Sequence, residues 1–253
     1  MADRIDPSGL ARSRTATTVA IDAGLRTYML RIYNYMTSGV LLTGIMAMLG
    51  YQLPVLRDLL YQTVMTPAGM RVGLTGFGWL VAIAPLGFVL VLSLGINRLK
   101  PATAQMLFWA FAAVMGLSLS SIFMAYTGVS IARTFFVTAA SFAALSIYGY
   151  TTKRDLSAFG KFLFMGLIGL LVAMLVNLFV ASSAMDFIIS AIGVLIFAGL
   201  TAYDTQRLKR LYYEVGNAGE AAQRVAIMGA LALYLDFINL FLFLLRFMGQ
   251  SRN

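Results

Sequence analysis

The chain has no cysteine and no histidine in 253 residues. Without cysteine it has no disulfide framework and no thiol nucleophile, and without histidine it lacks the usual general base and the usual zinc ligand. It also contains neither a GxSxG turn nor a GxxxxGK loop, which would indicate a hydrolase nucleophile or a phosphate-binding loop. These absences exclude histidine-assisted serine or cysteine hydrolysis and HExxH metalloprotease chemistry, so we expect no enzyme and no cofactor.

Charged residues are also scarce, at 11% of the chain, while 60% of the residues are hydrophobic. Soluble globular proteins average roughly 45–50% apolar and about 25% charged residues, so this composition predicts an integral membrane protein. The net charge of +9 would suggest a nucleic-acid partner only if the basic residues were clustered on one soluble face. They are spread over the predicted loops, so no nucleic-acid partner is expected.

Seven apolar stretches are long enough to cross a hydrocarbon core of roughly 30 Å, which takes about 20 residues. They predict an all-α membrane protein with one seven-helix transmembrane domain over residues 28–249 and a C-terminal tail over residues 250–253. Small residues such as Gly166 and Gly169 favour close helix packing. The predicted spans are Tyr33 to Leu53, Leu74 to Ile96, Ala104 to Tyr126, Val129 to Tyr150, Phe159 to Ala181, Phe187 to Leu208 and Val225 to Phe247.

The first 27 residues are predicted to form a polar N-terminal tail. They lack the continuous apolar segment of a cleaved signal peptide, and their acids Asp3, Asp6 and Asp22 are untypical of a transit peptide.

The distribution of lysine and arginine predicts the orientation, because cytoplasmic loops carry the excess of positive charge. With the N-terminus in the cytoplasm, fourteen of the nineteen basic residues lie inside, and the C-terminus lies outside after seven spans. The five on the outer side are Arg57, Arg71, Arg133, Arg246 and Arg252. Because Arg246 and Arg252 oppose the rule, a re-entrant last segment with a cytoplasmic C-terminus is the alternative.

Two of the ten acidic residues fall inside predicted spans: Asp204, near the cytoplasmic end of the sixth, and Asp236, well within the seventh. A carboxylate at the centre of a membrane helix costs at least about 2.5–3.5 kcal/mol on insertion, so it normally faces protein or water and has a partner. If the two spans form an antiparallel hairpin, the midpoint between the acids is Glu220, and an apex at Asn217 leaves a mismatch of about five residues, or roughly 7 Å. The two acids are therefore predicted to meet.

Two carboxylates in contact cannot both ionise without a large cost, so we expect them to share one proton. In the protonated state they would link two helices. In the doubly ionised state they would repel each other and offer the oxygen ligands that calcium prefers. This predicts a pH-dependent gate for a divalent cation, with Asp204 and Asp236 as tentative calcium ligands.

Structural roles for these residues are an alternative. Asp204 is three residues before Arg207 and would form a local helix pair, and Asp236 would hydrogen-bond Tyr203, Asn239 or Asn177. Arg98, at the cytoplasmic end of the second span, is the cation most available to the acids, although it would also serve as an ordinary interfacial arginine.

Several segments together resemble the bacterial branch of the Bax inhibitor-1 family, also called the lifeguard or transmembrane Bax-inhibitor-motif family. They are "AGLRTYMLRIYNYM", "LKPATAQMLFWAFAAVMGLSLSSIF", "YGYTTKRDLSAFGKFLFMGLIGL", "GLTAYDTQRLK" and "LALYLDFINLFLFLLRFMG", and the resemblance covers roughly Ala23 to Gly249.

The resemblance implies a seven-helix bundle with the last helix at its centre, and a di-aspartyl pH sensor formed by Asp204 and Asp236. It further implies a calcium leak channel of the bacterial inner membrane, closed while the pair is protonated, with Arg98 as the latch that binds the pair. One departure is that the second span contains no acid, whereas some bacterial relatives carry one there.

Two other functions compete with the leak channel. Some bacterial relatives are similar to a modulator of a membrane-bound AAA protease, and here the tail from Met1 to Thr27 would make that contact. An intramembrane aspartyl protease would also need two membrane aspartates, but "LYLDFIN" lacks the GxGD pattern of those enzymes.

Overall fold

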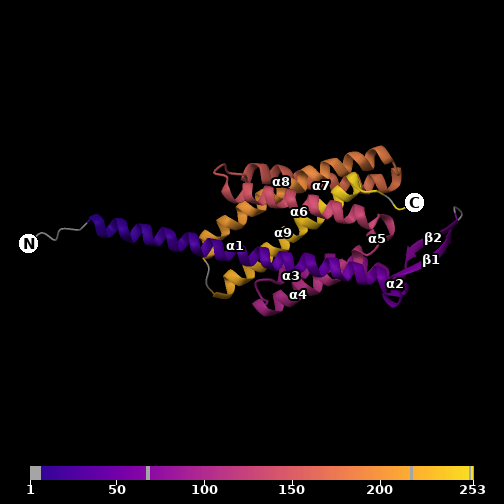
Figure 1. The fold of residues 1–253 in the computed structure, drawn as a ribbon, viewed down its shortest axis with the longest axis horizontal. Helices are drawn as coiled ribbons and strands as arrows, with labels where there is room; N and C mark the ends of the chain where they lie inside the picture. The colour runs from indigo at the N-terminus through magenta and orange to yellow at the C-terminus, as the bar shows by residue number, and fades with distance from the viewer. Residues whose placement is uncertain (1–6, 67–68, 217–218, 251, 253) are drawn as a thin grey trace, which may run out of the picture.

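The computed structural model describes residues 7–66, 69–216, 219–250 and 252, with side chains from residue 23 onward except at Thr66. The chain forms a helical bundle with a small β-hairpin at one end (Figure 1). The elements are α1 (Pro7–Gln52), α2 (Pro54–Leu60), β1 (Tyr61–Thr66), β2 (Gly69–Leu74), α3 (Gly76–Gly95), α4 (Pro101–Leu119), α5 (Ile122–Ala125), α6 (Gly128–Thr151), α7 (Ser157–Val180), α8 (Ser183–Val215) and α9 (Gly219–Met248).

Seven segments in the described part of the chain are long and apolar enough to cross a membrane, which confirms the predicted fold class. α1 begins inside the expected polar tail, and among the described side chains its membrane-spanning segment lies within residues 23–52. α8 is longer than predicted, and its 33 residues rise about 50 Å against a hydrocarbon core of roughly 30 Å. The C-terminal turns of α8 therefore extend beyond the core, at the end of the bundle where α1 enters.

Proline and threonine residues define where the helices begin. Pro54 and Pro101 occupy the first turns of α2 and α4, where the missing amide hydrogen has no intrahelical partner to lose. The Thr75 side chain accepts a hydrogen bond of 2.9 Å from the Gly78 amide and caps α3. These signals place the helix starts close to the boundaries that hydrophobicity predicts.

The two-stranded hairpin was not predicted. β1 and β2 pair in antiparallel fashion, with Tyr61 opposite Leu74 and Met65 opposite Met70. The hairpin projects from the end of the bundle opposite the N-terminus (Figure 1), and it fills the connection that the sequence had left as a loop.

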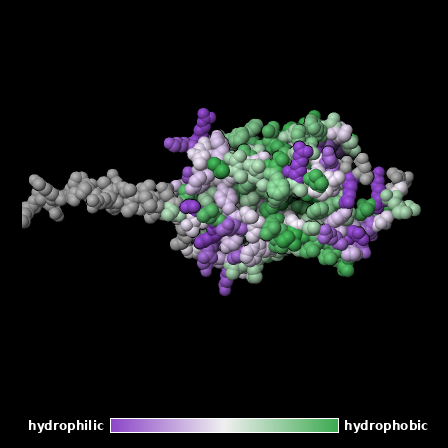
Figure 2. Space-filling view, viewed as in Figure 1, coloured by the Kyte–Doolittle hydropathy of each residue, from purple (hydrophilic) through white to green (hydrophobic). Residues whose placement is uncertain are grey.

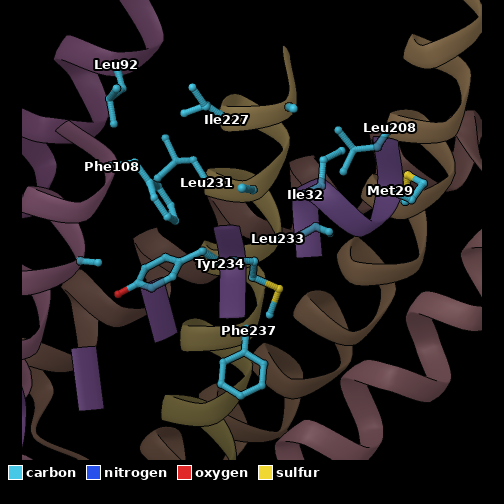
Figure 3. Packing of buried hydrophobic residues seen from close by; sticks show 14 of the residues in the cluster. Met29, Ile32, Leu92, Phe108, Leu208, Ile227, Leu231, Leu233, Tyr234 and Phe237 are labelled. Carbon is cyan, nitrogen blue, oxygen red and sulfur yellow. The ribbon is translucent and has the colours of Figure 1, made fainter. Parts of the chain in front are cut away.

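α9 is the central helix, as predicted. In the most apolar 18-residue stretch of α9, 67% of the residues are buried, compared with 11% in the corresponding stretch of α7 at the periphery. Figure 3 shows Leu233, Tyr234 and Phe237 of α9 projecting into a core shared with Phe108 of α4 and Ile32 of α1. An apolar helix without a lipid-facing side can hold a polar group only where a neighbouring helix contacts it.

The surface carries the pattern of a membrane-spanning protein. Figure 2 shows hydrophobic residues gathered over the middle of the visible face and hydrophilic residues toward both ends. Large apolar side chains are exposed on the outer helices, including Leu86 of α3, Phe162 of α7 and Leu195 of α8, all more than half exposed. Lipid tails would cover these side chains in a bilayer.

Helix packing relies on glycines, but not on those that were predicted. A Cβ added to Gly169 would meet no atom within 4 Å, and one added to Gly166 would lie 3.3 Å from the end of the Ile196 side chain, which would have to shift slightly. In contrast, Gly149 of α6 and Gly193 of α8 leave no room for a side chain against Ala202 and Phe243. The close approaches are therefore between α6 and α8 and between α8 and α9.

The two termini lie at opposite ends of the bundle (Figure 1). The Arg252 guanidinium donates hydrogen bonds to the Tyr51 hydroxyl at the end of α1 and to the Phe123 carbonyl in α5. Arg246 lies 3.9 Å from Asp186 at the start of α8. α9 is one continuous helix that ends beside these segments, and the re-entrant alternative, which concerns the path of the chain through a membrane, stays a prediction.

Candidate functional site

The connection between α8 and α9 fixes the relative depth of the two intramembrane acids. α8 ends at Val215 and α9 begins at Gly219. Gly216 and Gly219 have φ angles of 77° and 85°, in the left-handed region that glycine enters without strain. The connection therefore lies between Val215 and Gly219, before Glu220, which is the midpoint between the acids.

The carboxyl groups of Asp204 on α8 and Asp236 on α9 lie close enough for a side-chain hydrogen bond between them. Asp236 is only 4% exposed, whereas 16% of the Asp204 side chain is exposed. An ionised carboxylate can only accept hydrogen bonds. The bond between them therefore requires a proton on one of the two.

Asp236 has little other stabilisation. Its Oδ2 atom is buried and has no hydrogen-bond partner. The expected alternatives make different contacts: the Asn239 amide donates to the Leu235 carbonyl, and the Asn177 side chain accepts from the Ser182 amide. The Asp204 carboxyl is a polar neighbour of Asp236 in the core.

Asp204 also forms the local pair that was predicted as its structural role. Its Oδ1 atom lies 3.8 Å from the guanidinium of Arg207, whose side chain is 57% exposed. Exposed pairs of this kind contribute between zero and about 1 kcal/mol, because water screens them and two side chains must be ordered. Asp204 thus faces a solvated cation on one side and a buried carboxyl on the other.

A cavity of about 300 Å³ leads to Asp204 from the end of the bundle that holds the α8–α9 connection. Asp204 and Arg207 line it from α8, Arg224 and Ala232 line it from α9, and Asn97 lies at its edge after α3. Ala232 is one helical turn before Asp236. The cavity therefore ends at the contact between the two acids.

A second cavity, of about 400 Å³, approaches from the opposite end of the bundle. It is lined by Tyr126, Arg246 and Asn239, among others, and Asn239 is three residues after Asp236. Along α9 the deepest lining residues of the two cavities, Ala232 and Asn239, are seven residues or about 10 Å apart. Asp236 lies in this segment of α9, between the ends of the two cavities.

Arg98, the predicted latch, is not brought to the acids. It follows α3, one residue after the cavity-lining Asn97, and its side chain is exposed. No ion pair joins it to Asp204 or Asp236 among the residues that the structure describes. Arg207 and Arg224 are the basic residues that line the cavity, so the role of Arg98 stays a prediction.

The acids alone make a poor resident metal site. Nowhere in the described part of the chain do three or more His, Cys, Asp or Glu side chains gather closely enough to hold an ion. Calcium takes six to eight oxygen ligands, so two carboxylates would leave most positions to water or carbonyl groups. The chemistry of the donor set favours brief contact with a cation over tight binding.

A chain of hydroxyl groups beside the site was missed by the sequence reasoning. Tyr33 of α1 contacts Ser146 of α6, and Ser146 lies 2.9 Å from the hydroxyl of Thr205, the residue after Asp204. Thr205 donates to the carbonyl of Thr201, one turn earlier. Each residue separately is a common small or aromatic polar residue in a membrane helix, so only the packing identifies the chain.

The remaining prediction concerns the N-terminal tail as a contact for a protein partner. The side chains of Met1 to Asp22 lie outside the described residues. The tail as a partner contact therefore stays a prediction.

The chain matches the protein family described as Inhibitor of apoptosis-promoting Bax1 over residues 25–253. It is 47% identical to an uncharacterized protein of Rickettsia prowazekii, covering 95% of this chain and 98% of that one. It is also 47% identical to the inner membrane protein YbhL of Escherichia coli K12, over 94% and 98% of the two chains. An uncharacterized protein of Deinococcus radiodurans is 46% identical over 90% and 92%.

Proposed function

This chain belongs to the Bax inhibitor-1 family of membrane proteins, and from this premise we propose that it is a pH-sensitive calcium leak channel gated by Asp204 and Asp236. It contains seven membrane-spanning helices, and its relative YbhL is an inner membrane protein. The proposal further places the chain in the bacterial inner membrane with its N-terminus in the cytoplasm. It assigns no catalytic residue and no resident cofactor.

The observation that carries the proposal is the position of the carboxyl pair between two cavities. One cavity ends at Asp204 and the other approaches to within three residues of Asp236. About 10 Å of α9 separates them, and a hydrogen bond between the acids would join α8 to α9 in this interval. This is the arrangement of a closed pathway whose barrier contains its own titratable link.

Loss of the shared proton provides a physical mechanism for opening. It removes the hydrogen bond and leaves two negative charges in a poorly hydrated site, where they repel strongly. The same step exposes carboxylate oxygens, which are suitable transient ligands for calcium. Opening is therefore expected to increase with pH, and protonation is expected to restore the closed state.

The test is calcium flux into proteoliposomes as a function of pH. The wild type should conduct more as the pH rises, whereas Asp236→Asn and Asp204→Asn should lose this dependence, because an amide–carboxyl pair never carries two charges. Asp186→Asn is the matched control, since this exposed acid is also on α8 but lies at the other end of the bundle.

Two results would contradict the proposal in different ways. Wild-type flux equal to that of empty liposomes at every pH would exclude a leak and favour a non-conducting regulator, for example one that binds a membrane-bound protease. Flux with an unchanged pH dependence in both Asp→Asn variants would keep the leak but exclude the pair as its sensor.

A further inference from the structure

A groove on the side of the bundle has no role in the proposed gate. It has a volume of about 720 Å³ and runs between α1 and α6, where Phe237 of α9 forms part of its lining. Met29, Met36 and Phe142 contribute apolar surface to it. α1 and α6 are both membrane-spanning segments, so in a bilayer this groove opens toward lipid.

The end of the groove nearest the N-terminal side carries positive charge. Arg26 lines the groove, is exposed, and forms no ion pair with the residues that the structure describes. Tyr150 lines it from α6, and the Lys209 ammonium group donates to the Tyr150 carbonyl at 2.9 Å and lies 5.1 Å from the centre of its ring. Among the side chains that the structure describes, no acidic one lines the groove. The local charge therefore favours an anion at this end.

Below the charged end the groove contains a few hydroxyl groups and then becomes apolar. Tyr33 lines it about two turns deeper than Arg26, and Ser146 lines it about one turn deeper than Tyr150, as the rise of each helix places them. The far end is lined by Val40 and by Phe135. Polarity thus decreases from a cationic mouth through hydroxyl groups to hydrocarbon, which is the order of groups along a phospholipid molecule.

The length of the groove also suits a lipid in one leaflet. Arg26 and Val40 are fourteen residues apart on α1, which corresponds to about 21 Å. One leaflet provides about half of the 30 Å hydrocarbon core, with the headgroup region in addition. The groove therefore spans from headgroup depth to near the middle of the bilayer.

We propose that the groove between α1 and α6 is a binding site for an anionic phospholipid. The phosphate lies at Arg26 and close to Lys209, the glycerol ester oxygens lie at the depth of Tyr33 and Ser146, and one acyl chain packs along Phe142 toward Phe135. The inference is independent of the gate, because it rests on residues that do not line either cavity at the carboxyl pair.

Photo-crosslinking tests the proposal directly. Phosphatidylglycerol with a photoactivatable acyl chain is incorporated at low density into phosphatidylcholine vesicles that hold the full-length protein, and labelled peptides are identified by mass spectrometry. Labelling should concentrate on residues 26–40 and 135–150 and should fall on adding unlabelled phosphatidylglycerol but not phosphatidylcholine. Equal competition by the two lipids, or labelling spread evenly over the exposed faces of α3 and α7, would overturn the proposal.

Substitutions at each end of the groove test which part of the lipid that end binds. Arg26→Gln should reduce labelling about five-fold, which corresponds to about 1 kcal/mol for one basic residue near an anionic lipid surface. Lys161→Gln is the matched control, because this exposed lysine lies near the start of α7 and does not line the groove. Ala143→Trp should block the groove and abolish labelling. Labelling that is unchanged in Arg26→Gln would contradict the assignment of the phosphate.

Discussion

Gly149 of α6 lies directly against the backbone of Ala202 on α8, so closely that a side chain at position 149 would overlap the Ala202 carbonyl oxygen. Ala202 is two residues before Asp204. The contact therefore fixes the position of α8 at the depth of the carboxyl pair.

Gly149→Ala should destabilise the bundle although alanine is the better helix former. Helix propensity alone would favour the substitution by about 1 kcal/mol, but overpacking against a backbone atom typically costs about 1–3 kcal/mol. Thermal unfolding of the purified protein in detergent measures the difference. Gly169→Ala is the matched control, because its added Cβ meets no atom within 4 Å. Equal melting temperatures for the two variants would contradict the close contact between α6 and α8.

The hydroxyl groups of Tyr234 and Thr43 are 2.6 Å apart in the core, and Thr43 also donates to the Ala112 carbonyl at 2.8 Å. A threonine hydroxyl has one proton, so Tyr234 must donate to Thr43. Tyr234→Phe should then cost about 0.5–1.5 kcal/mol, whereas Thr43→Val leaves the tyrosine hydroxyl buried without a partner and should cost about 1–3 kcal/mol.

The informative result is which of the two single variants loses more free energy of unfolding. The double variant Tyr234→Phe with Thr43→Val should be less destabilised than the sum of the single ones, because no unpaired hydroxyl remains. Chemical unfolding in mixed micelles gives the three free energies. If Tyr234→Phe proves the more damaging single change, the donor assignment is wrong.

Arg98 and Arg207 are the two candidates for the cation that holds the gate closed, and they can be distinguished by substitution. If Arg98 is the latch, Arg98→Gln should raise calcium flux at acidic pH, where the wild type is closed. Arg207→Gln is the structural comparison, because it removes the guanidinium that lies 3.8 Å from Asp204. Flux measured in proteoliposomes at acidic pH distinguishes the two, and an increase in Arg207→Gln alone would transfer the role to Arg207.

The loop between α6 and α7 carries an acid outside the membrane-spanning segments. Hydrogen bonds from Ser157 and from Arg210 lower the pKa of Asp155 below its ordinary value of 3.8. A lowered pKa in the folded state stabilises the fold above the ordinary value, and this contribution is lost as the pH falls through the folded pKa. The melting temperatures of the wild type and Asp155→Asn should therefore converge below about pH 4. Ser157→Ala removes the hydroxyl partner and should move the pH of this convergence upward. A difference in melting temperature between the wild type and Asp155→Asn that does not change with pH would argue against the hydrogen bonds.

The spans and the acid pair were predictable from the sequence for simple physical reasons. The length of an apolar run determines whether a helix crosses the bilayer. Two acids in consecutive antiparallel helices can be placed at similar depth by counting from the turn. The count points to Asp204 because Asp236 has no comparable group nearby in sequence, so a polar contact for it would have to come from a neighbouring helix.

Other features depend on the packing of separate segments. Gly149 and Gly169 are equivalent in sequence terms, yet only Gly149 faces a neighbouring backbone. Both cavities at the site are lined by side chains from at least three separate segments of the chain, so no single segment predicts them. The hairpin is different, because "YQTVMTPAGMRVGL" has turn residues between β-favouring ones and carried a signal that could have been used.

The central position of α9 has a consequence for how the protein is made. The helix around which the other six are arranged is synthesised after those six, about 2–6 seconds after α8 at ordinary rates of bacterial synthesis. Until it arrives, the helices already inserted lack their common packing partner. Chains that stop before Gly219 should therefore be degraded as incomplete assemblies, whereas a loss of equal length at the N-terminus removes much less of the interior.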